Sequence, residues 1–237
     1  MDGAVRQSVS VWADLSVSDL WTAVDDYIDG LFEPPDEALD EALRASGAAG
    51  LPDIQITANQ GHFLQILARL AGARRILEIG TLGGYSTIWL ARALVPGGQL
   101  TTLEVDPKHA EVARANLSRA RLSEVVEIRV GPALETLPQL EGPFDFTFID
   151  ADKVNTAEYF AWAVKLSRPG SVIVVDNVVR EGALADAASD DANVRAMRRF
   201  LEAAATEPRV SMTVLQTVGR KKYDGFAIAL CTMPTPP

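Results

Sequence analysis

Short apolar runs alternate with amphipathic segments along most of the chain after residue 72. Each run suits a buried strand, and the segments between the runs have apolar residues at helical spacing. The predicted strands are, in chain order, Arg75–Ile79, Gln99–Glu104, Val125–Val130, Phe144–Ile149 and Ser171–Val175. The predicted helices that follow them are Ser86–Leu94, Pro107–Arg121, Ala133–Leu140, Thr156–Leu166 and Asp191–Ala205. Because alternating strands and helices form a parallel sheet through right-handed crossovers, we expect an α/β fold with helices on both faces.

The two ends of the chain have different patterns. At the C-terminal end, Val210–Gln216 and Gly225–Leu230 predict two strands joined by a tight turn, which adds an antiparallel hairpin to the sheet. The N-terminal end lacks strand signals, and its predicted helices are Val17–Phe32, which Pro34 and Pro35 end, Asp36–Ala48 and Thr57–Gly72. We therefore expect an N-terminal helical extension, residues 1–52, ahead of one α/β domain, residues 53–237.

Composition and charge narrow the function classes. The 237 residues are 48% hydrophobic and 23% charged, as in a soluble globular protein. The 32 acidic and 22 basic residues give a net charge of −10, which argues against broad binding to a nucleic-acid backbone. No apolar run is long enough to span a bilayer, no secretory signal is evident, and the single cysteine, Cys231, excludes an internal disulfide. We therefore expect a cytoplasmic protein without a membrane partner.

Polar side chains gather where the fourth and fifth predicted strands end. Asp150, Asp152 and Lys153 follow one strand, and Asp176 and Asn177 follow the other. Because the carboxyl ends of parallel strands meet at one edge of a sheet, these side chains should lie close together. Their carboxylate and amide oxygens suit a hard divalent cation, and Lys153 beside them is a candidate catalytic base.

A glycine-rich turn follows the first predicted strand and opens a helix. In the stretch from Glu78 to Ser86, Gly80 lets the backbone approach a ligand, and Ser86 is a candidate helix N-cap or ligand contact. Glu104, at the end of the second strand, is suited to accept hydrogen bonds from ribose hydroxyls. The turn lacks the G-x-G-x-x-G spacing of dinucleotide-binding loops. The acidic Glu78 suits a cationic cofactor without phosphate, such as S-adenosylmethionine.

These motifs together resemble the cation-dependent O-methyltransferases, the group with the caffeoyl-coenzyme A and catechol enzymes, and above all their small bacterial relatives. The matching stretches are Leu77–Ser86, Thr102–Asp106, Gly131–Leu134, Phe148–Lys153, Val175–Asn177 and Tyr223–Phe226. The resemblance implies a Rossmann-like class I methyltransferase fold, with a mostly parallel seven-stranded sheet and a C-terminal antiparallel hairpin. It also implies a homodimer, and it links the N-terminal extension and segment 180–191 to the acceptor pocket and the dimer contact.

The resemblance also implies roles for individual residues. A magnesium-like ion would be bound by Asp150, Asp176 and Asn177. Lys153 matches the position of the family's proposed base, and Asp150 would be the second catalytic residue. The residues that would bind S-adenosylmethionine are Ile56, Glu78, Gly80, Ser86, Glu104, Ala133 and Asp150.

We therefore predict metal-dependent transfer of a methyl group from S-adenosylmethionine to a hydroxyl of a small vicinal dihydroxy aromatic, such as a catechol, a caffeoyl phenol or a flavonoid. The alternative is a methyltransferase for a hydroxylated base in transfer RNA, which the acidic charge disfavours. The glycine spacing argues against a nicotinamide-dependent dehydrogenase, and a non-catalytic cofactor-binding protein would need neither Lys153 nor the metal ligands. We expect His109 on an exposed helix and Tyr223 in the turn before the last strand, neither with a role in the site.

Overall fold

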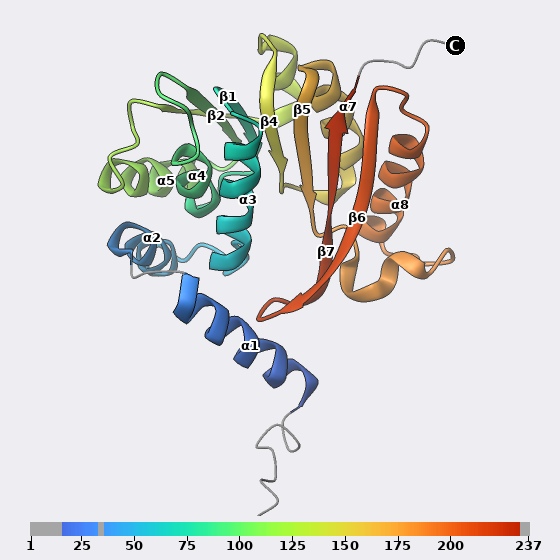
Figure 1. The fold of residues 1–237 in the computed structure, drawn as a ribbon, viewed down its shortest axis with the longest axis horizontal. Coiled ribbons are helices and arrows are strands. Elements are labelled where there is room, and N and C mark those ends of the chain that lie inside the picture. The colour runs from blue at the N-terminus through green and yellow to red at the C-terminus, as the bar shows by residue number, and fades with distance from the viewer. Residues whose placement is uncertain (1–15, 33–35, 233–237) are drawn as a thin grey trace, which may run out of the picture.

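The computed structural model describes residues 16–32 and 36–232, and the strands in this part of the chain form one seven-stranded sheet (Figure 1). The strands are β1 (Arg75–Ile79), β2 (Gln99–Glu104), β3 (Val126–Val130), β4 (Phe144–Ile149), β5 (Ser167–Asp176), β6 (Val210–Gly219) and β7 (Lys222–Cys231). Their order is β3-β2-β1-β4-β5-β7-β6, and β7 runs antiparallel to both of its neighbours. This arrangement confirms the predicted mostly parallel sheet with its C-terminal antiparallel hairpin.

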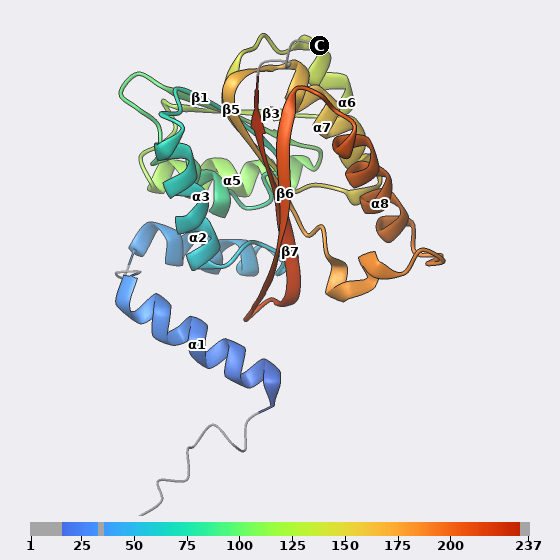
Figure 2. The same ribbon diagram turned by 45° about the vertical axis from the view of Figure 1, so that its right-hand side comes forward.

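Helices cover both faces of the sheet (Figures 1 and 2). One face carries α3 (Ala58–Leu70), α4 (Tyr85–Ala91) and α5 (Pro107–Arg119), and the other carries α6 (Ala133–Thr136), α7 (Thr156–Lys165) and α8 (Ala192–Ala205). Successive side chains of a strand point to opposite faces, so Ile76 joins the core beside α3 and Leu77 joins the core beside α7. No helix of the described residues combines the length and the apolar character that crossing a membrane requires.

Side-chain caps explain where four of the helices begin. The capping residues, each of which accepts a backbone N–H from the first turn that follows it, are Asp36, Thr57, Asp106 and Asp191. They precede α2 (Glu37–Ala48), α3, α5 and α8 in that order. Replacing such a cap by alanine typically costs about 1 kcal/mol of stability. These local signals are why the predicted starts of the four helices agree closely with the structure.

Several element ends differ from the prediction. The predicted helix over residues 133–140 is divided, because Pro138 has no N–H for a helical hydrogen bond, and the 3₁₀ turn Leu137–Gln139 replaces its second half. β5 begins at Ser167 instead of Ser171, since a register shift lets Ser167 pair with Phe144. α4 ends at Ala91, three residues earlier than predicted.

The β6–β7 hairpin is longer than the apolar pattern indicates. Its ladder continues into polar positions, where Thr217 pairs with Asp224 and Gly219 pairs with Lys222. The connecting turn is therefore Arg220–Lys221, and Lys222 after it has a φ of 69°. Since the outer part of the hairpin extends beyond the apolar core, no apolar alternation marked it in the sequence.

The two N-terminal helices have different surroundings. α2 contributes Leu39 and Ala42 to the core that also contains Trp89 of α4. α1 (Val17–Phe32) has the predicted bounds and contacts α3 and β6 at the lower edge of the molecule in Figure 1. Pro34 and Pro35, which the sequence predicted to end α1, lie outside the described residues.

Candidate active site

The loops that leave β1 and β4 meet where the strand order reverses. Ligands of such sheets bind at the carboxyl ends of strands beside this reversal. A Cβ added to Gly80 would lie 2.1 Å from the backbone oxygen of Asp150, so only glycine fits the contact between the two loops. Gly80 also has a φ of 101°, a conformation that favours glycine. Gly80 and Asp150 therefore lie side by side at the reversal.

A cavity of about 630 Å³ opens over these loops, and we call it the large cavity. The residues predicted to bind a cofactor that line it are Ile56, Gly80, Ser86, Glu104, Ala133 and Asp150. Lys153 and Asn177 line it as well. Of the residues predicted to bind the cofactor, Glu78 does not line this cavity, and neither does Asp176, which was predicted as a metal ligand.

Glu104 lies at the end of β2 with its carboxylate held by the backbone. Its Oε2 accepts the N–H of Leu82 at 2.8 Å and that of Thr81 at 3.2 Å, and Oε1 accepts the N–H of Asp106 at 2.9 Å. Each oxygen of an ionised carboxylate can accept more than one hydrogen bond. Glu104 can therefore still accept hydrogen bonds from the hydroxyl groups of a ligand in the large cavity, while the backbone holds its carboxylate in one orientation.

Glu78 is fully buried on the side of the sheet beneath α4. Its carboxylate accepts hydrogen bonds from three hydroxyls, those of Ser86 at 2.7 Å, Thr87 at 2.5 Å and Thr102 at 2.7 Å. Burial raises the pKa of Glu78 to about 7, against the opposing effect of these hydrogen bonds. Glu78 thus contacts Ser86, which lines the large cavity, and does not line that cavity itself.

Ser86 does not cap its helix. α4 begins at Tyr85, and the N-cap is Gly84 in a left-handed conformation, which makes Ser86 the second residue of the helix. The N-cap interpretation from the sequence is therefore wrong. The Ser86 hydroxyl donates to Glu78, and Ser86 lines the large cavity. Its position therefore allows the other predicted role, contact with a ligand.

Asp150 and Lys153 form an ion pair directly after β4. Lys153 Nζ donates to Asp150 Oδ1 at 2.8 Å, and the two side chains are 12% and 22% exposed. Asp152, between them in sequence, faces a different partner, since it accepts hydrogen bonds from Tyr159 and Asn155. The pair therefore supplies one anionic and one cationic group at the wall of the large cavity.

Asp176 and Asn177 end β5 next to this pair. Burial and the nearby Asp150 carboxylate raise the pKa of Asp176 to about 7, while Lys153 and a hydrogen bond from Gln60 act in the opposite direction. Asn177 follows with a φ of 57°, a left-handed conformation that asparagine adopts more readily than most residues. The structure thus brings two carboxylates, an amide and an amine to one edge of the sheet.

This donor set suits a hard divalent cation. Within residues 16–32 and 36–232, no group of three His, Cys, Asp or Glu side chains could hold a metal ion. The set predicted from the sequence has a different composition, with two carboxylates and one amide oxygen. Oxygen donors of this kind bind Mg²⁺, which keeps several of its waters and needs only one or two carboxylates. Burial and the neighbouring Asp150 carboxylate both disfavour the charged form of Asp176, and a cation between the two carboxylates would offset their repulsion.

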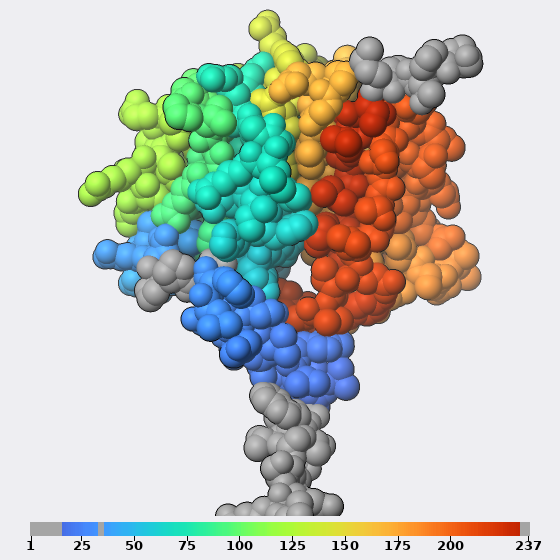
Figure 3. All heavy atoms as spheres, viewed as in Figure 1, coloured from blue at the N-terminus to red at the C-terminus, as the bar shows by residue number. Residues whose placement is uncertain are grey.

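A second cavity, of about 360 Å³, lies between α3 and the β6–β7 hairpin, and we call it the hairpin cavity. Asp176 and Asn177 line it, and Asn177 lines the large cavity too, so the two cavities meet at the candidate metal ligands. Phe63 and Phe226 also line it, with ring centroids 5.0 Å apart. Figure 3 shows the surface hollowed between α3, the hairpin and α1.

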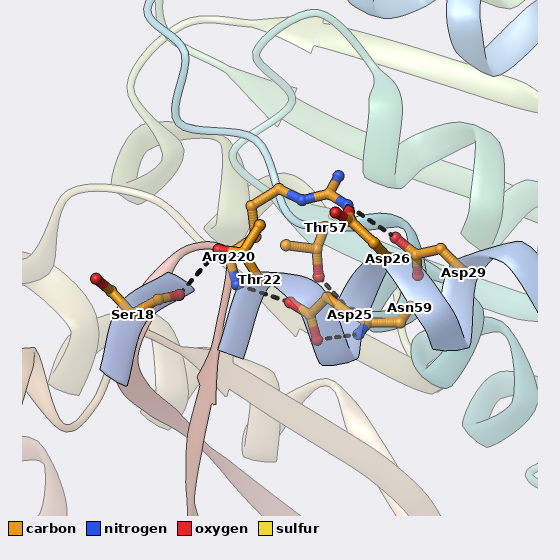
Figure 4. Close-up of polar contacts among 8 residues, drawn as sticks. All are labelled: Ser18, Thr22, Asp25, Asp26, Asp29, Thr57, Asn59 and Arg220. Atoms are coloured by element: carbon orange, nitrogen blue, oxygen red, sulfur yellow. Dashed lines mark hydrogen bonds and ion pairs between the residues drawn. The ribbon is translucent and has the colours of Figure 1, made fainter. Parts of the chain in front are cut away.

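α1 is attached to the tip of the hairpin by a polar cluster (Figure 4). Asp25 is buried, and its carboxylate accepts the backbone N–H of Arg220 at 2.7 Å and the Asn59 amide at 3.2 Å. The Arg220 guanidinium pairs with Asp26 and lies 3.4 Å from Asp29. Because Asp25 also lines the hairpin cavity, α1 forms part of that cavity's wall.

Two residues outside the predicted set also contribute to the site. His109 was expected on an exposed helix, but it lines the large cavity with Nδ1 3.6 Å from Glu104 Oε1. Gln60 donates to Asp176 from α3. The only sequence signal for His109 was its place in the first turn after Glu104, and Gln60 had none. Tyr223 was expected in the turn before the last strand, but it lies within β7 and pairs with Val218. It lines neither cavity, as expected, and its hydroxyl bonds to Gln216.

Comparison with known proteins identifies the family. A family model described as O-methyltransferase matches residues 33–230. The chain belongs to the O-methyltransferase family. It is 56% identical over 208 residues to a catechol O-methyltransferase of Mycobacterium tuberculosis, covering 87% of this chain and 94% of that one. It is also 51% identical over 215 residues to a catechol O-methyltransferase of Niastella koreensis, covering 89% of this chain and 97% of that one.

Solved structures agree with this family. An O-methyltransferase from Bacillus cereus in complex with S-adenosylhomocysteine is 55% identical, with a TM-score of 0.89 over 90% of this chain and 99% of that chain. The O-methyltransferase TomG of Streptomyces achromogenes, in complex with S-adenosylmethionine, is 50% identical, with a TM-score of 0.90 over 92% and 100%. The chain is therefore an S-adenosylmethionine-dependent O-methyltransferase with the predicted Rossmann-like class I fold.

Proposed function

We propose that this O-methyltransferase methylates one hydroxyl of a small vicinal dihydroxy aromatic in a reaction that depends on a divalent cation, most suitably Mg²⁺. The observation that carries the proposal is the meeting of two cavities at Asp150, Asp176 and Asn177, with Lys153 paired to Asp150. The names of the two catechol O-methyltransferase relatives support the acceptor class.

The large cavity is the proposed cofactor site. Glu104 would accept the ribose hydroxyls, and Ser86 would bind the methionine end of the cofactor with its hydroxyl oriented by Glu78. Gly80, with Ile56 and Ala133, would bring backbone groups against the ligand, as the close approach of Gly80 to Asp150 suggests. The role proposed for Glu78 is thus indirect, because Ser86 separates it from the cavity.

The proposed cation ligands are Asp150, Asp176 and Asn177. The chemistry that a divalent cation supplies when bound is a lower pKa of the acceptor hydroxyl and stabilisation of the negative charge on its oxygen. Gln60 would hold the Asp176 carboxylate in place. Lys153, which is 12% exposed and within hydrogen-bond reach of Asp150, is the proposed acceptor of the hydroxyl proton, in the neutral amine form that a cation bound at Asp150 would favour.

The hairpin cavity is the proposed acceptor site. It reaches Asp176 and Asn177 from the side away from the glycine-rich turn, and Phe63 and Phe226 offer apolar surface for an aromatic ring. A methyl donor in one cavity and an acceptor in the other would meet at the cation ligands, where in-line transfer needs them. Neither the net charge of −10 nor the named relatives favour the transfer-RNA alternative.

The homodimer and the cytoplasmic location remain predictions from the sequence. The exposed apolar side chains on α1, among them Tyr27 and Leu31, offer a surface on which a second copy would be expected to pack. Sedimentation of the full chain would test the oligomeric state.

Methyl transfer from S-adenosylmethionine to a panel of catechols, with magnesium and with excess chelator, tests the function. We expect transfer that the chelator abolishes and added magnesium restores. Isothermal titration with S-adenosylhomocysteine in the same samples controls for the cofactor site. Transfer that survives chelation would contradict the metal role, and cofactor binding without transfer to any catechol would contradict the acceptor class.

A further inference from the structure

Lys222 has a backbone conformation that favours glycine. It follows the two-residue turn Arg220–Lys221, and its φ of 69° lies in the left-handed region. Glycine is the usual residue at such a position after a hairpin turn, because a Cβ there costs free energy. Residues held in such conformations concentrate at functional sites. A lysine here therefore suggests that its side chain provides something that glycine would not.

Lys222 also lines the hairpin cavity. Along β7, Phe226 pairs with Asp176, and Lys222 precedes Phe226 by four residues, or roughly 13 Å of strand. The hairpin cavity therefore has the candidate metal ligands at one end, the apolar pair Phe63 and Phe226 between, and Lys222 towards the other end. An acceptor ring packed against this pair would extend its substituent towards Lys222.

Two carboxylates that line the hairpin cavity, those of Asp224 and Asp25, already accept hydrogen bonds within the protein. Asp224 Oδ1 accepts the backbone N–H groups of Val179 and Arg180, both at 3.0 Å, and that of Gly225 at 2.9 Å. Asp25 accepts the backbone N–H of Arg220 at 2.7 Å and the Asn59 amide. Both carboxylates thus have donors of their own, which reduces their repulsion of a negatively charged ligand.

Lys221 of the turn and Lys222 after it both line the hairpin cavity, but their side chains differ in their partners. Lys221 Nζ donates to the backbone oxygen of Asp53 at 3.2 Å and lies 3.9 Å from its carboxylate. The Lys222 ammonium has no hydrogen bond or ion pair with any of the residues that the structure describes. Of these two cations, Lys222 is therefore the one available to a ligand.

We propose that Lys222 makes the enzyme prefer catechols whose ring substituent carries a negative charge, a carboxylate being the simplest case. The proposal rests on the proposed function, since it takes the hairpin cavity as the acceptor site. It concerns recognition of the acceptor and assigns Lys222 no part in the chemical step.

Caffeate and its methyl ester provide the test, because they share the ring and its two hydroxyls and differ in the charge of the substituent. Their dissociation constants would be measured by calorimetry on the full chain, saturated with S-adenosylhomocysteine in magnesium buffer. The wild type should bind the acid about fivefold more tightly than the ester. The ratio should fall to about one in Lys222→Gly and invert in Lys222→Glu. Lys108→Gln is the matched control, because Lys108 is exposed on α5 and lines neither cavity, and it should keep the wild-type ratio.

Thermal unfolding shows whether the variants are folded. Lys222→Gly should melt no lower than the wild type, because glycine relieves the left-handed conformation. A wild-type ratio near one, or a ratio that Lys222→Gly leaves unchanged, would overturn the proposal. Methylation of the ester by the wild type, measured separately, reports on the proposed function, so charge selection can fail while that function stands. If neither compound binds, both fail.

Discussion

Glu78 and Glu104 are both acidic residues at strand ends, and the sequence assigned both to the cofactor. Glu104 faces the large cavity with its carboxylate oriented by backbone N–H groups. Glu78 is covered by α4 and meets only hydroxyls. Burial without a compensating cation is what raises the pKa of Glu78 to about 7. The difference between the two residues is therefore one of position relative to α4, not of residue type.

Glu78→Gln should change how stability depends on pH. The pKa of Glu78 rises from 4.5 to about 7 on folding, so the folded chain binds more protons between these values and loses stability as pH rises through them. Glutamine does not titrate. The unfolding free energy of the wild type should therefore fall relative to the variant by roughly 2–3 kcal/mol between about pH 4.5 and pH 8. Urea unfolding at several pH values, with chelator present, measures this.

The matched control is Glu111→Gln, because Glu111 is exposed on α5. Its stability difference from the wild type should stay nearly constant over the same pH range. If the Glu78→Gln and Glu111→Gln curves run in parallel, the raised pKa of Glu78 is contradicted.

At the scale of elements, the β6–β7 hairpin near the C-terminal end of the chain contacts α1 near the N-terminal end. Its turn holds α1 through Asp25, and Gly219 leaves room for this contact, because a Cβ there would lie 2.5 Å from Asp25 Oδ2. α1 thereby becomes a wall of the hairpin cavity. The position of one surface helix thus bears on the proposed acceptor site.

Asp25→Ala should loosen α1. Removing this buried carboxylate leaves the Arg220 N–H and the Asn59 amide without their acceptor, which should cost about 1–3 kcal/mol of stability. The Michaelis constant for the acceptor should rise while cofactor affinity stays unchanged. Urea unfolding and steady-state kinetics with a catechol measure the two effects.

Asp26→Ala is the comparison for this variant. Asp26 pairs with the same arginine, but its side chain is 61% exposed, so its loss should cost less than about 1 kcal/mol. Equal effects of the two substitutions on stability and on the Michaelis constant would contradict the role given to Asp25.

At the scale of the whole molecule, the two cavities share Asn177 and otherwise have different lining residues. Asp176 lines only the hairpin cavity, whereas Glu104 lines only the large cavity. Methyl transfer needs both cavities, but cofactor binding should need one. This separation allows binding and turnover to be tested apart.

Asp176→Asn should abolish magnesium-dependent methyl transfer and keep stabilisation by S-adenosylhomocysteine. A ligand at one hundred times its dissociation constant adds about 2.7 kcal/mol to the unfolding free energy. We expect this increment in the wild type and in Asp176→Asn, and its loss at the same ligand concentration in Glu104→Ala. Denaturant unfolding with and without the ligand measures it. Loss of the increment in Asp176→Asn would show that the cavities are not separable.

Local signals made much of this fold predictable. The strand Arg75–Ile79 and the helix Val17–Phe32 were predicted with the bounds that the structure has, because apolar periodicity is strong in both. The outer half of the hairpin was missed, since its ladder pairs polar residues. The helix capping role of Ser86 was wrong because the left-handed turn at Gly84 starts the helix one residue earlier.

The sequence by itself determined the order of strands and helices, and it identified the polar residues at the strand ends, because both depend on neighbours along the chain. The tertiary structure decided which of these residues face a cavity. In the structure, Ser86 separates Glu78 from the large cavity, Gln60 of α3 contacts Asp176, and Lys222 lines the hairpin cavity. Gln60 and Asp176 are far apart in sequence, and the surroundings of Glu78 and Lys222 depend on how helices pack over the sheet, which local patterns do not encode.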